Sequence, residues 1–125
     1  MRQSVHTADA PRALGTYSQA IVAGNTVYLS GQIGLDPATG ELADGFENQL
    51  HRVFRNLSAV AAEAGTSLDA AVRATVFLVD FADFPKLNDI MAQYFREPYP
   101  SRTTVQVSAL PKGARVEVDV ILAKG

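Results

Sequence analysis

The chain has 125 residues, of which 47% are apolar and 19% are charged, with a net charge of −2 and no cysteine. This length allows one domain, residues 1–125, with a single core, and the balance of apolar and charged residues is that of a folded globular protein. The lack of cysteine excludes thiol catalysis, cysteine metal sites and disulfides, and the acidic balance argues against general nucleic-acid binding, which needs many lysines and arginines against phosphates.

The first third of the sequence predicts a β-hairpin followed by a loop. Residues 20–23 and 26–30 are rich in aliphatic and β-branched side chains, and the Gly24-Asn25 pair between them is a two-residue break of the kind that closes a hairpin. Residues 35–40 contain proline, glycine and an aspartate able to bond its own backbone, which is typical of a loop.

Two helices and a strand are predicted in the middle of the chain. Apolar residues recur every three or four positions over residues 46–64, which indicates a helix of about five turns, and Gly65 follows as a stop signal. Residues 71–80 contain a β-branched and aromatic run consistent with a buried strand. Residues 84–95 carry apolar side chains at helical spacing and predict the second helix.

The last quarter of the chain predicts two strands, residues 103–107 and 115–122, separated by a turn at 110–113. The order is therefore ββ-α-β-α-ββ, an α/β (α+β) arrangement in which two helices cover one face of a sheet of roughly four to six strands. Side chains alternate along a strand, so the valine-rich side of the last strand should meet the helices. We expect the polar residues, Arg102, Thr104 and Glu117 among them, to lie on the opposite face, open to water or to other subunits.

Arg102 and Glu117 together outline a pocket for a small carboxylate. A guanidinium in a strand needs an anion, and it binds a carboxylate through two parallel, charge-assisted hydrogen bonds. A paired or neighbouring strand would bring Glu117 near Arg102, where its carboxylate can hold a water molecule. Such proximity would lower the pKa of Glu117. By residue type alone, Arg102 also fits a solvated surface position, and Glu117 fits its structural ion-pair partner.

Short motifs occur along nearly the whole chain in a fixed order. They are residues 15–20 (GTYSQA), 27–33 (VYLSGQI), 35–40 (LDPATG), 48–49 (NQ), 56–57 (NL), 75–78 (TVFL), 87–88 (LN), 100–102 (PSR), 105–107 (VQV), 110–111 (LP) and 116–118 (VEV). In this order they resemble the Rid family, the reactive intermediate deaminases also called YjgF proteins.

The resemblance implies a chorismate-mutase-like subunit with a mixed sheet and two helices on one face. It also implies a homotrimer whose sheets form a central barrel, with ligand clefts between subunits. The implied reaction is hydrolysis of small 2-imino acids, such as 2-iminopropanoate and 2-iminobutanoate, to 2-keto acids and ammonia without metal or cofactor, which protects against reactive metabolites. The implied catalytic residues are Arg102 and Glu117, and the implied substrate-binding residues are Tyr17, Ser30, Gly31, Asn88, Arg102 and Thr104.

Two positions depart from the family pattern. Thr16 stands where many relatives have proline, which leaves the Tyr17 loop less constrained. Thr104 stands where many relatives have cysteine, so any contribution at this position comes from backbone groups or from the hydroxyl.

Four further implied residues have simpler explanations that stay open. Tyr17 also fits an ordinary packing position with its hydroxyl in water. Ser30 and Gly31 also fit the end of a strand or a β-bulge, where glycine is common. Asn88 also fits an ordinary polar position in a helix.

Two other functions remain open. One is a non-catalytic trimeric module that binds small carboxylates or other proteins, and the other is the ribonuclease or translation-inhibitor activity attached to some relatives. The acidic balance and the lack of a paired histidine site disfavour the second. The expected partners are small 2-imino and 2-keto carboxylates and further copies of the chain. No apolar run has the length of a membrane span or signal peptide, so we expect a cytoplasmic protein.

Overall fold

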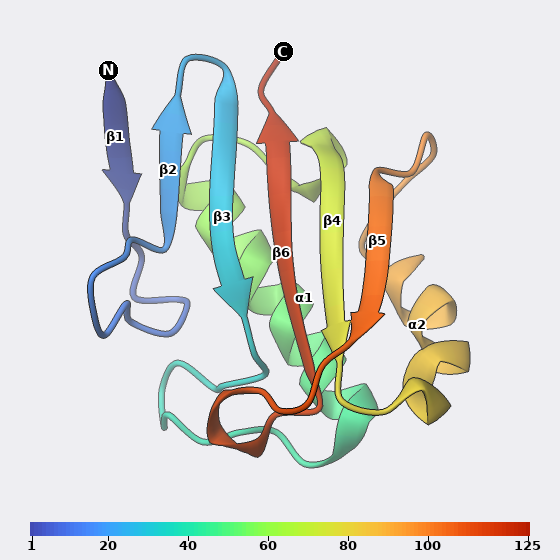
Figure 1. Cartoon of the computed structure of the whole chain (residues 1–125). Coiled ribbons are helices and arrows are strands. Elements are labelled where there is room, and N and C mark those ends of the chain that lie inside the picture. Colours follow the sequence, from blue (N-terminus) through green and yellow to red (C-terminus); the bar gives the residue numbers. More distant parts are fainter.

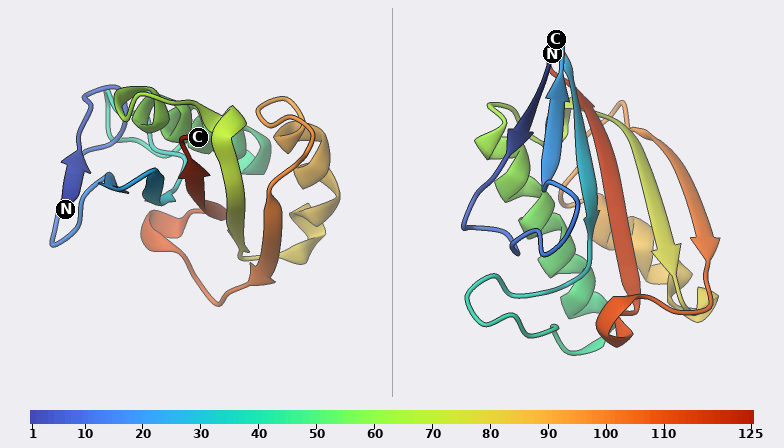
Figure 2. Two further views of the ribbon diagram at one scale, coloured as in Figure 1. Left: turned by 90° about the horizontal axis from the view of Figure 1, so that it is seen from above. Right: turned by 60° about the vertical axis from the view of Figure 1, so that its left-hand side comes forward.

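The computed structural model describes all of residues 1–125 and has two layers, a six-stranded mixed sheet and two α-helices. The strands are β1 (Arg2–Val5), β2 (Ala20–Ala23), β3 (Thr26–Gln32), β4 (Ala71–Leu78), β5 (Ser101–Gln106) and β6 (Val116–Ala123), and the helices are α1 (Gly45–Glu63) and α2 (Phe84–Met91). Both helices lie on one face of the sheet, and the other face is uncovered (Figures 1 and 2). The predicted fold class is confirmed.

The strands follow the order β1-β2-β3-β6-β4-β5 across the sheet. Neighbouring strands are antiparallel except β4 and β5, which are parallel. Helix α2 forms the crossover between these two parallel strands, because parallel neighbours cannot be joined by a tight turn. The last strand, β6, thus lies in the centre of the sheet between β3 and β4 (Figure 1).

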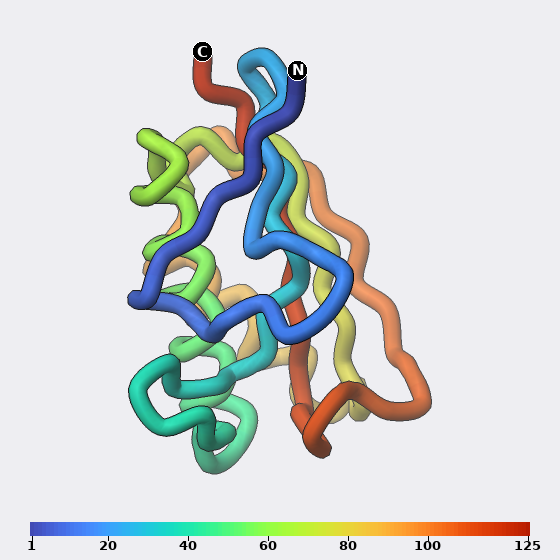
Figure 3. Tube along the Cα trace, turned by 90° about the vertical axis from the view of Figure 1, so that its left-hand side faces the viewer, coloured from blue at the N-terminus to red at the C-terminus, as the bar shows by residue number.

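The core lies between the sheet and α1. The valine-rich side of β6 faces the helices as predicted, since Val116, Val118, Val120 and Leu122 are all at most 1% exposed. Helix α1 contributes a fully buried stripe that includes Leu50, Phe54 and Leu57. Burying one such side chain stabilises the fold by about 1.5–3 kcal/mol. Seen edge-on, α1 lies along one side of the strands (Figure 3).

Two features of the fold differ from the sequence-based expectation. Strand β1 was not predicted, because three of its four residues are exposed and its sequence has no apolar alternation. Helix α2 ends at Met91 and not at residue 95. The chain tightens into turns there, because Tyr94 and Phe95 pack against Phe54 with ring centroids 5.0 and 5.4 Å away.

Candidate functional site

Arg102 and Thr104 lie on the helix side of β5, so the prediction that they face away from the helices is wrong. In the parallel register of β4 and β5, Arg102 pairs with Ala74 and Thr104 with Val76, and both partners are fully buried beneath the helices. β5 is an edge strand of the sheet, so a long side chain on this side can reach past the sheet edge toward α2. Polarity alone therefore misassigned the face.

The guanidinium of Arg102 is held by three residues of α2. Its Nη1 donates a hydrogen bond to Asn88 Oδ1 at 2.7 Å and lies 3.7 Å from Met91 Sδ. Its Cζ lies 5.9 Å from the centroid of the Phe84 ring, within cation–π range. Nη1 is thus engaged, whereas Nε and Nη2 form no hydrogen bond within the chain. This free edge of the guanidinium has the two parallel donors that a carboxylate accepts.

A cavity of about 530 Å³ opens beside Arg102. Its lining residues are Asn88, Met91, Ala92, Tyr99, Pro100 and Arg102. One cation and one amide thus face a largely apolar wall, which is the usual composition of a site for a small organic ligand. Tyr99, which is 57% exposed, contributes an aromatic ring to this lining.

Glu117 lies on the opposite face of the sheet. It pairs with Phe77 of β4, while its neighbours Val116 and Val118 point into the core. Strand β4 lies between the strands that carry Glu117 and Arg102. The expected proximity of these two residues within one chain is therefore wrong, because alternation and register place them on different faces.

Gly31 and Tyr17 accompany Glu117 in a second cavity of about 280 Å³. A Cβ at Gly31 would collide with the Glu117 carboxylate, so any larger residue here would displace the Glu117 side chain from its position. The register of β3 with β6 shifts between Leu29 and Gln32, which agrees with a bulge at this point. Ser30, within the same irregularity, donates its hydroxyl to the carbonyl oxygen of Ser18 at 2.6 Å. Its side chain thus holds the loop that leads to Tyr17.

Burial raises the pKa of Glu117 above its ordinary value, and the negative charge of Asp119 raises it further. The expected lowering of this pKa by Arg102 is therefore wrong, since the guanidinium lies beyond the sheet. Burial also raises the pKa of Asp119, against the opposing effects of a hydrogen bond from Thr75 and the charge of Arg73. A carboxylate with a raised pKa accepts protons more readily at neutral pH.

The structure thus divides the implied site residues into two groups. Arg102 and Asn88 line one cavity, and Tyr17, Gly31 and Glu117 line the other. Two residues line neither of them. The hydroxyl of Ser30 is bound internally, and the Oγ1 atom of Thr104 is buried without a hydrogen-bond partner.

Phe84 and Met91 were missed as contacts of Arg102, although a sequence signal exists. Positions 84, 88 and 91 follow the i, i+4, i+7 spacing of one helical face, and Asn88 was already implied in the site. The three side chains therefore meet the guanidinium together.

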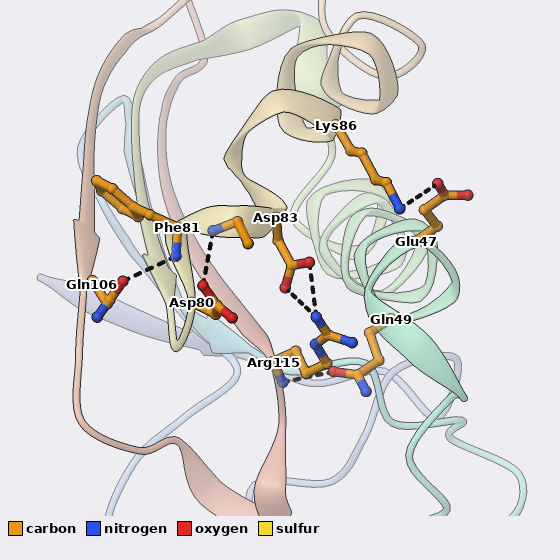
Figure 4. A network of polar contacts seen from close by, with 9 residues as sticks. Glu47, Gln49, Asp80, Phe81, Asp83, Lys86, Gln106 and Arg115 are labelled. Atoms are coloured by element: carbon orange, nitrogen blue, oxygen red, sulfur yellow. Dashed lines mark hydrogen bonds and ion pairs between the residues drawn. The ribbon is translucent and has the colours of Figure 1, made fainter.

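A polar network fixes the segment that precedes α2 (Figure 4). Arg115 Nη2 lies 2.8 Å from both carboxylate oxygens of the buried Asp83, and the backbone N–H of Arg115 donates to Gln49 Oε1 at 2.8 Å. The backbone N–H of Phe81 donates to Gln106 Oε1 at 2.9 Å, and the Phe81 ring contacts that of Phe84. The first turn of α2, and with it Phe84, is thereby held in place.

Replacing Phe84 with leucine is expected to raise the dissociation constant of a small carboxylate bound at Arg102 about threefold. An exposed cation–π contact contributes about 0.5–1 kcal/mol, and leucine keeps the bulk without the aromatic face. Calorimetric titration of pyruvate into Phe84→Leu and Phe84→Tyr would test this, because tyrosine restores the ring. Equal affinities for pyruvate in the wild type and both variants would contradict it.

No group of three or more histidine, aspartate or glutamate side chains is placed to hold a metal ion. Neither α1 nor α2 has the length and apolar character needed to cross a membrane.

Comparison with known proteins gives consistent matches. The family model described as Endoribonuclease L-PSP matches residues 7–124. The chain is 48% identical to protein DfrA of Myxococcus xanthus, over 96% of this chain and 94% of the relative. It is 42% identical to the 2-iminobutanoate/2-iminopropanoate deaminase of Bos taurus, over 100% of this chain and 92% of the relative. The crystal structure of RidA from the Antarctic bacterium Psychrobacter sp. PAMC 21119 is similar, with a TM-score of 0.94 and 50% identity over 97% of this chain and 98% of that chain.

Proposed function

The chain belongs to the Endoribonuclease L-PSP family, which includes the RidA (YjgF) proteins, and we propose that it hydrolyses small 2-imino acids to 2-keto acids and ammonia. The substrates we infer are 2-iminopropanoate and 2-iminobutanoate, the compounds in the name of the Bos taurus relative. The observation that carries this proposal is the free Nε–Nη2 edge of Arg102 beside a cavity of about 530 Å³.

Each proposed catalytic residue has a separate task. Nε and Nη2 of Arg102 bind the substrate carboxylate, which fixes the plane of the imine. Glu117 accepts a proton from a water molecule as the water oxygen attacks the imine carbon. Glu117 then returns this proton to the imine nitrogen, which gives a neutral carbinolamine. The carbinolamine hydroxyl transfers its proton to the amino group as the C–N bond breaks and the C=O bond forms, so that one imine and one water give one keto acid and one ammonia.

We infer that the reaction cleft forms between adjacent copies in a homotrimer. Arg102 and Glu117 lie on opposite faces of the sheet, so one copy has only half of the site at each cavity. A cyclic assembly brings the Arg102 cavity of one protomer to the Glu117 cavity of the next. The uncovered face of the sheet supports association, since it exposes apolar side chains such as Tyr28 (50%) and Val105 (37%).

The deciding experiment generates the imine in the presence of the protein. A threonine dehydratase or an amino-acid oxidase supplies the imine, and its loss is followed with and without the purified chain. Faster loss than in buffer is expected, together with a trimer mass in solution scattering. Carboxylate binding without acceleration would instead support the non-catalytic module. RNA cleavage that disappears in Arg102→Ala would support the ribonuclease alternative.

A further inference from the structure

The cavity beside Glu117 carries more positive charge than the proposed reaction uses. Arg12 and Lys112 line it together with Glu117. Neither cation forms an ion pair or a side-chain hydrogen bond within the chain. The whole chain has a net charge of −2, so two unpaired cations at one cavity are a local excess.

The backbone that carries Arg12 is anchored by a buried side chain. Gln19 is 2% exposed, and its Nε2 donates hydrogen bonds to the carbonyl oxygens of Pro11 at 2.8 Å and Thr7 at 3.0 Å. Its Oε1 accepts the backbone N–H of Thr7 at 2.7 Å. The backbone next to Arg12 is therefore held in place at the edge of the cavity, although the Arg12 side chain is exposed.

The backbone at Lys112 is also specified. Lys112 has φ 58°, and it is the only residue other than glycine with a positive φ. Such a conformation is uncommon for a residue with a Cβ, and backbone outliers of this kind cluster at functional sites. The turn Pro111–Gly113 stands shortly before β6, which carries Glu117.

In the proposed cleft, one protomer supplies Arg102 and the next supplies Arg12, Lys112 and Glu117. The carboxylate of a simple imino acid occupies Arg102 and leaves the other two cations without a counter-charge. We propose that Arg12 and Lys112 bind a second carboxylate, so that the cleft prefers dicarboxylic 2-imino acids, of the kind formed by oxidation of aspartate and glutamate. This inference rests on the proposed function, because it places a substrate side chain in the same cleft.

The test compares two imines with one protein. An L-glutamate oxidase generates 2-iminoglutarate and an alanine-oxidising enzyme generates 2-iminopropanoate, and kcat/KM is measured for each. The wild type is expected to favour 2-iminoglutarate. In the double variant Arg12→Gln/Lys112→Gln, the ratio of the two kcat/KM values is expected to fall about tenfold, since each lost contact is charge-assisted. Lys124→Gln, an exposed lysine outside the cavity, should leave the ratio unchanged.

The outcomes separate the two proposals. If the wild type accelerates the loss of neither imine, the proposed function fails. If it hydrolyses 2-iminopropanoate and the double variant has the wild-type ratio, only the dicarboxylate inference is overturned. Calorimetric titration with 2-oxoglutarate and pyruvate gives a readout without turnover, and the variants should lose affinity mainly for 2-oxoglutarate. Equal losses for both ligands, with a smaller particle in solution, would show that the cations serve assembly and would overturn the inference.

Discussion

Replacing Arg102 with lysine is expected to lower kcat/KM for 2-iminopropanoate by about 100-fold or more. Lysine keeps the positive charge but cannot form two parallel hydrogen bonds in the plane of a carboxylate. Each charge-assisted hydrogen bond contributes about 1.5–3 kcal/mol, and about 1.4 kcal/mol corresponds to a factor of ten. The imine assay measures the loss directly, and Arg102→Ala should lose still more.

Arg96→Lys is the matched control for this substitution. Arg96 is 81% exposed and lies 3.6 Å from Asp69 in a surface ion pair, so its replacement should leave turnover unchanged. Turnover of Arg102→Lys within twofold of the wild type would contradict recognition by the guanidinium fork. Its affinity for pyruvate provides a second check, because product binding needs the same contact.

Replacing Glu117 with glutamine is expected to lower kcat by about 100- to 1,000-fold and to change KM little. A positioned general base contributes about 10²–10⁴-fold to rate, whereas substrate binding depends on Arg102. The matched control is Glu63→Gln, which alters an exposed carboxylate just inside the C-terminal end of α1. Full turnover by Glu117→Gln would mean that other groups orient the water molecule.

Glu117→Gln should also stabilise the folded chain at neutral pH. The pKa of Glu117 is raised in the folded state, so its contribution to stability is fully present below the ordinary glutamate pKa. That contribution is lost as pH rises through the raised pKa, and glutamine removes the loss. A higher Tm for Glu117→Gln than for the wild type at pH 7, and no difference at pH 4, would show this trade-off between activity and stability.

The pH profile of kcat identifies the base. Glu117 must be ionised to accept a proton, so kcat should fall as pH decreases through its raised pKa. Asp119→Asn removes the negative charge that further raises the pKa of Glu117. The acid limb of the kcat profile should then move to lower pH. An unchanged or higher acid limb in Asp119→Asn would exclude Glu117 as the titrating group.

Much of the fold was predictable because strong periodicity reflects one-sided burial. Helix α1 was expected over residues 46–64 and spans Gly45–Glu63, since its apolar stripe packs along the sheet. The same argument placed the buried side of β6 correctly. β1 gave no such signal, because a polar edge strand is specified by pairing with β2 and hardly by burial. The early end of α2 depends on aromatic packing between distant segments.

The candidate site was predictable in residue type but not in arrangement. Motif order pointed to Arg102, Asn88, Gly31 and Glu117, and the structure places all four at cavities. Which side of β5 carries Arg102 depends on its register with β4, which the sequence pattern does not reveal. The pKa of Glu117 was misjudged for the same reason, since its direction depends on which charges share its face.

The presentation of Arg102 and Glu117 on opposite faces of one sheet has a genetic consequence. In the proposed ring, no single polypeptide forms a complete active centre, because each centre takes Arg102 from one copy and Glu117 from its neighbour. A copy with Arg102→Ala still offers an intact Glu117, and a copy with Glu117→Gln still offers an intact guanidinium. Subunit exchange between these two defective proteins would therefore restore some working centres, so that two inactivating alleles would complement each other.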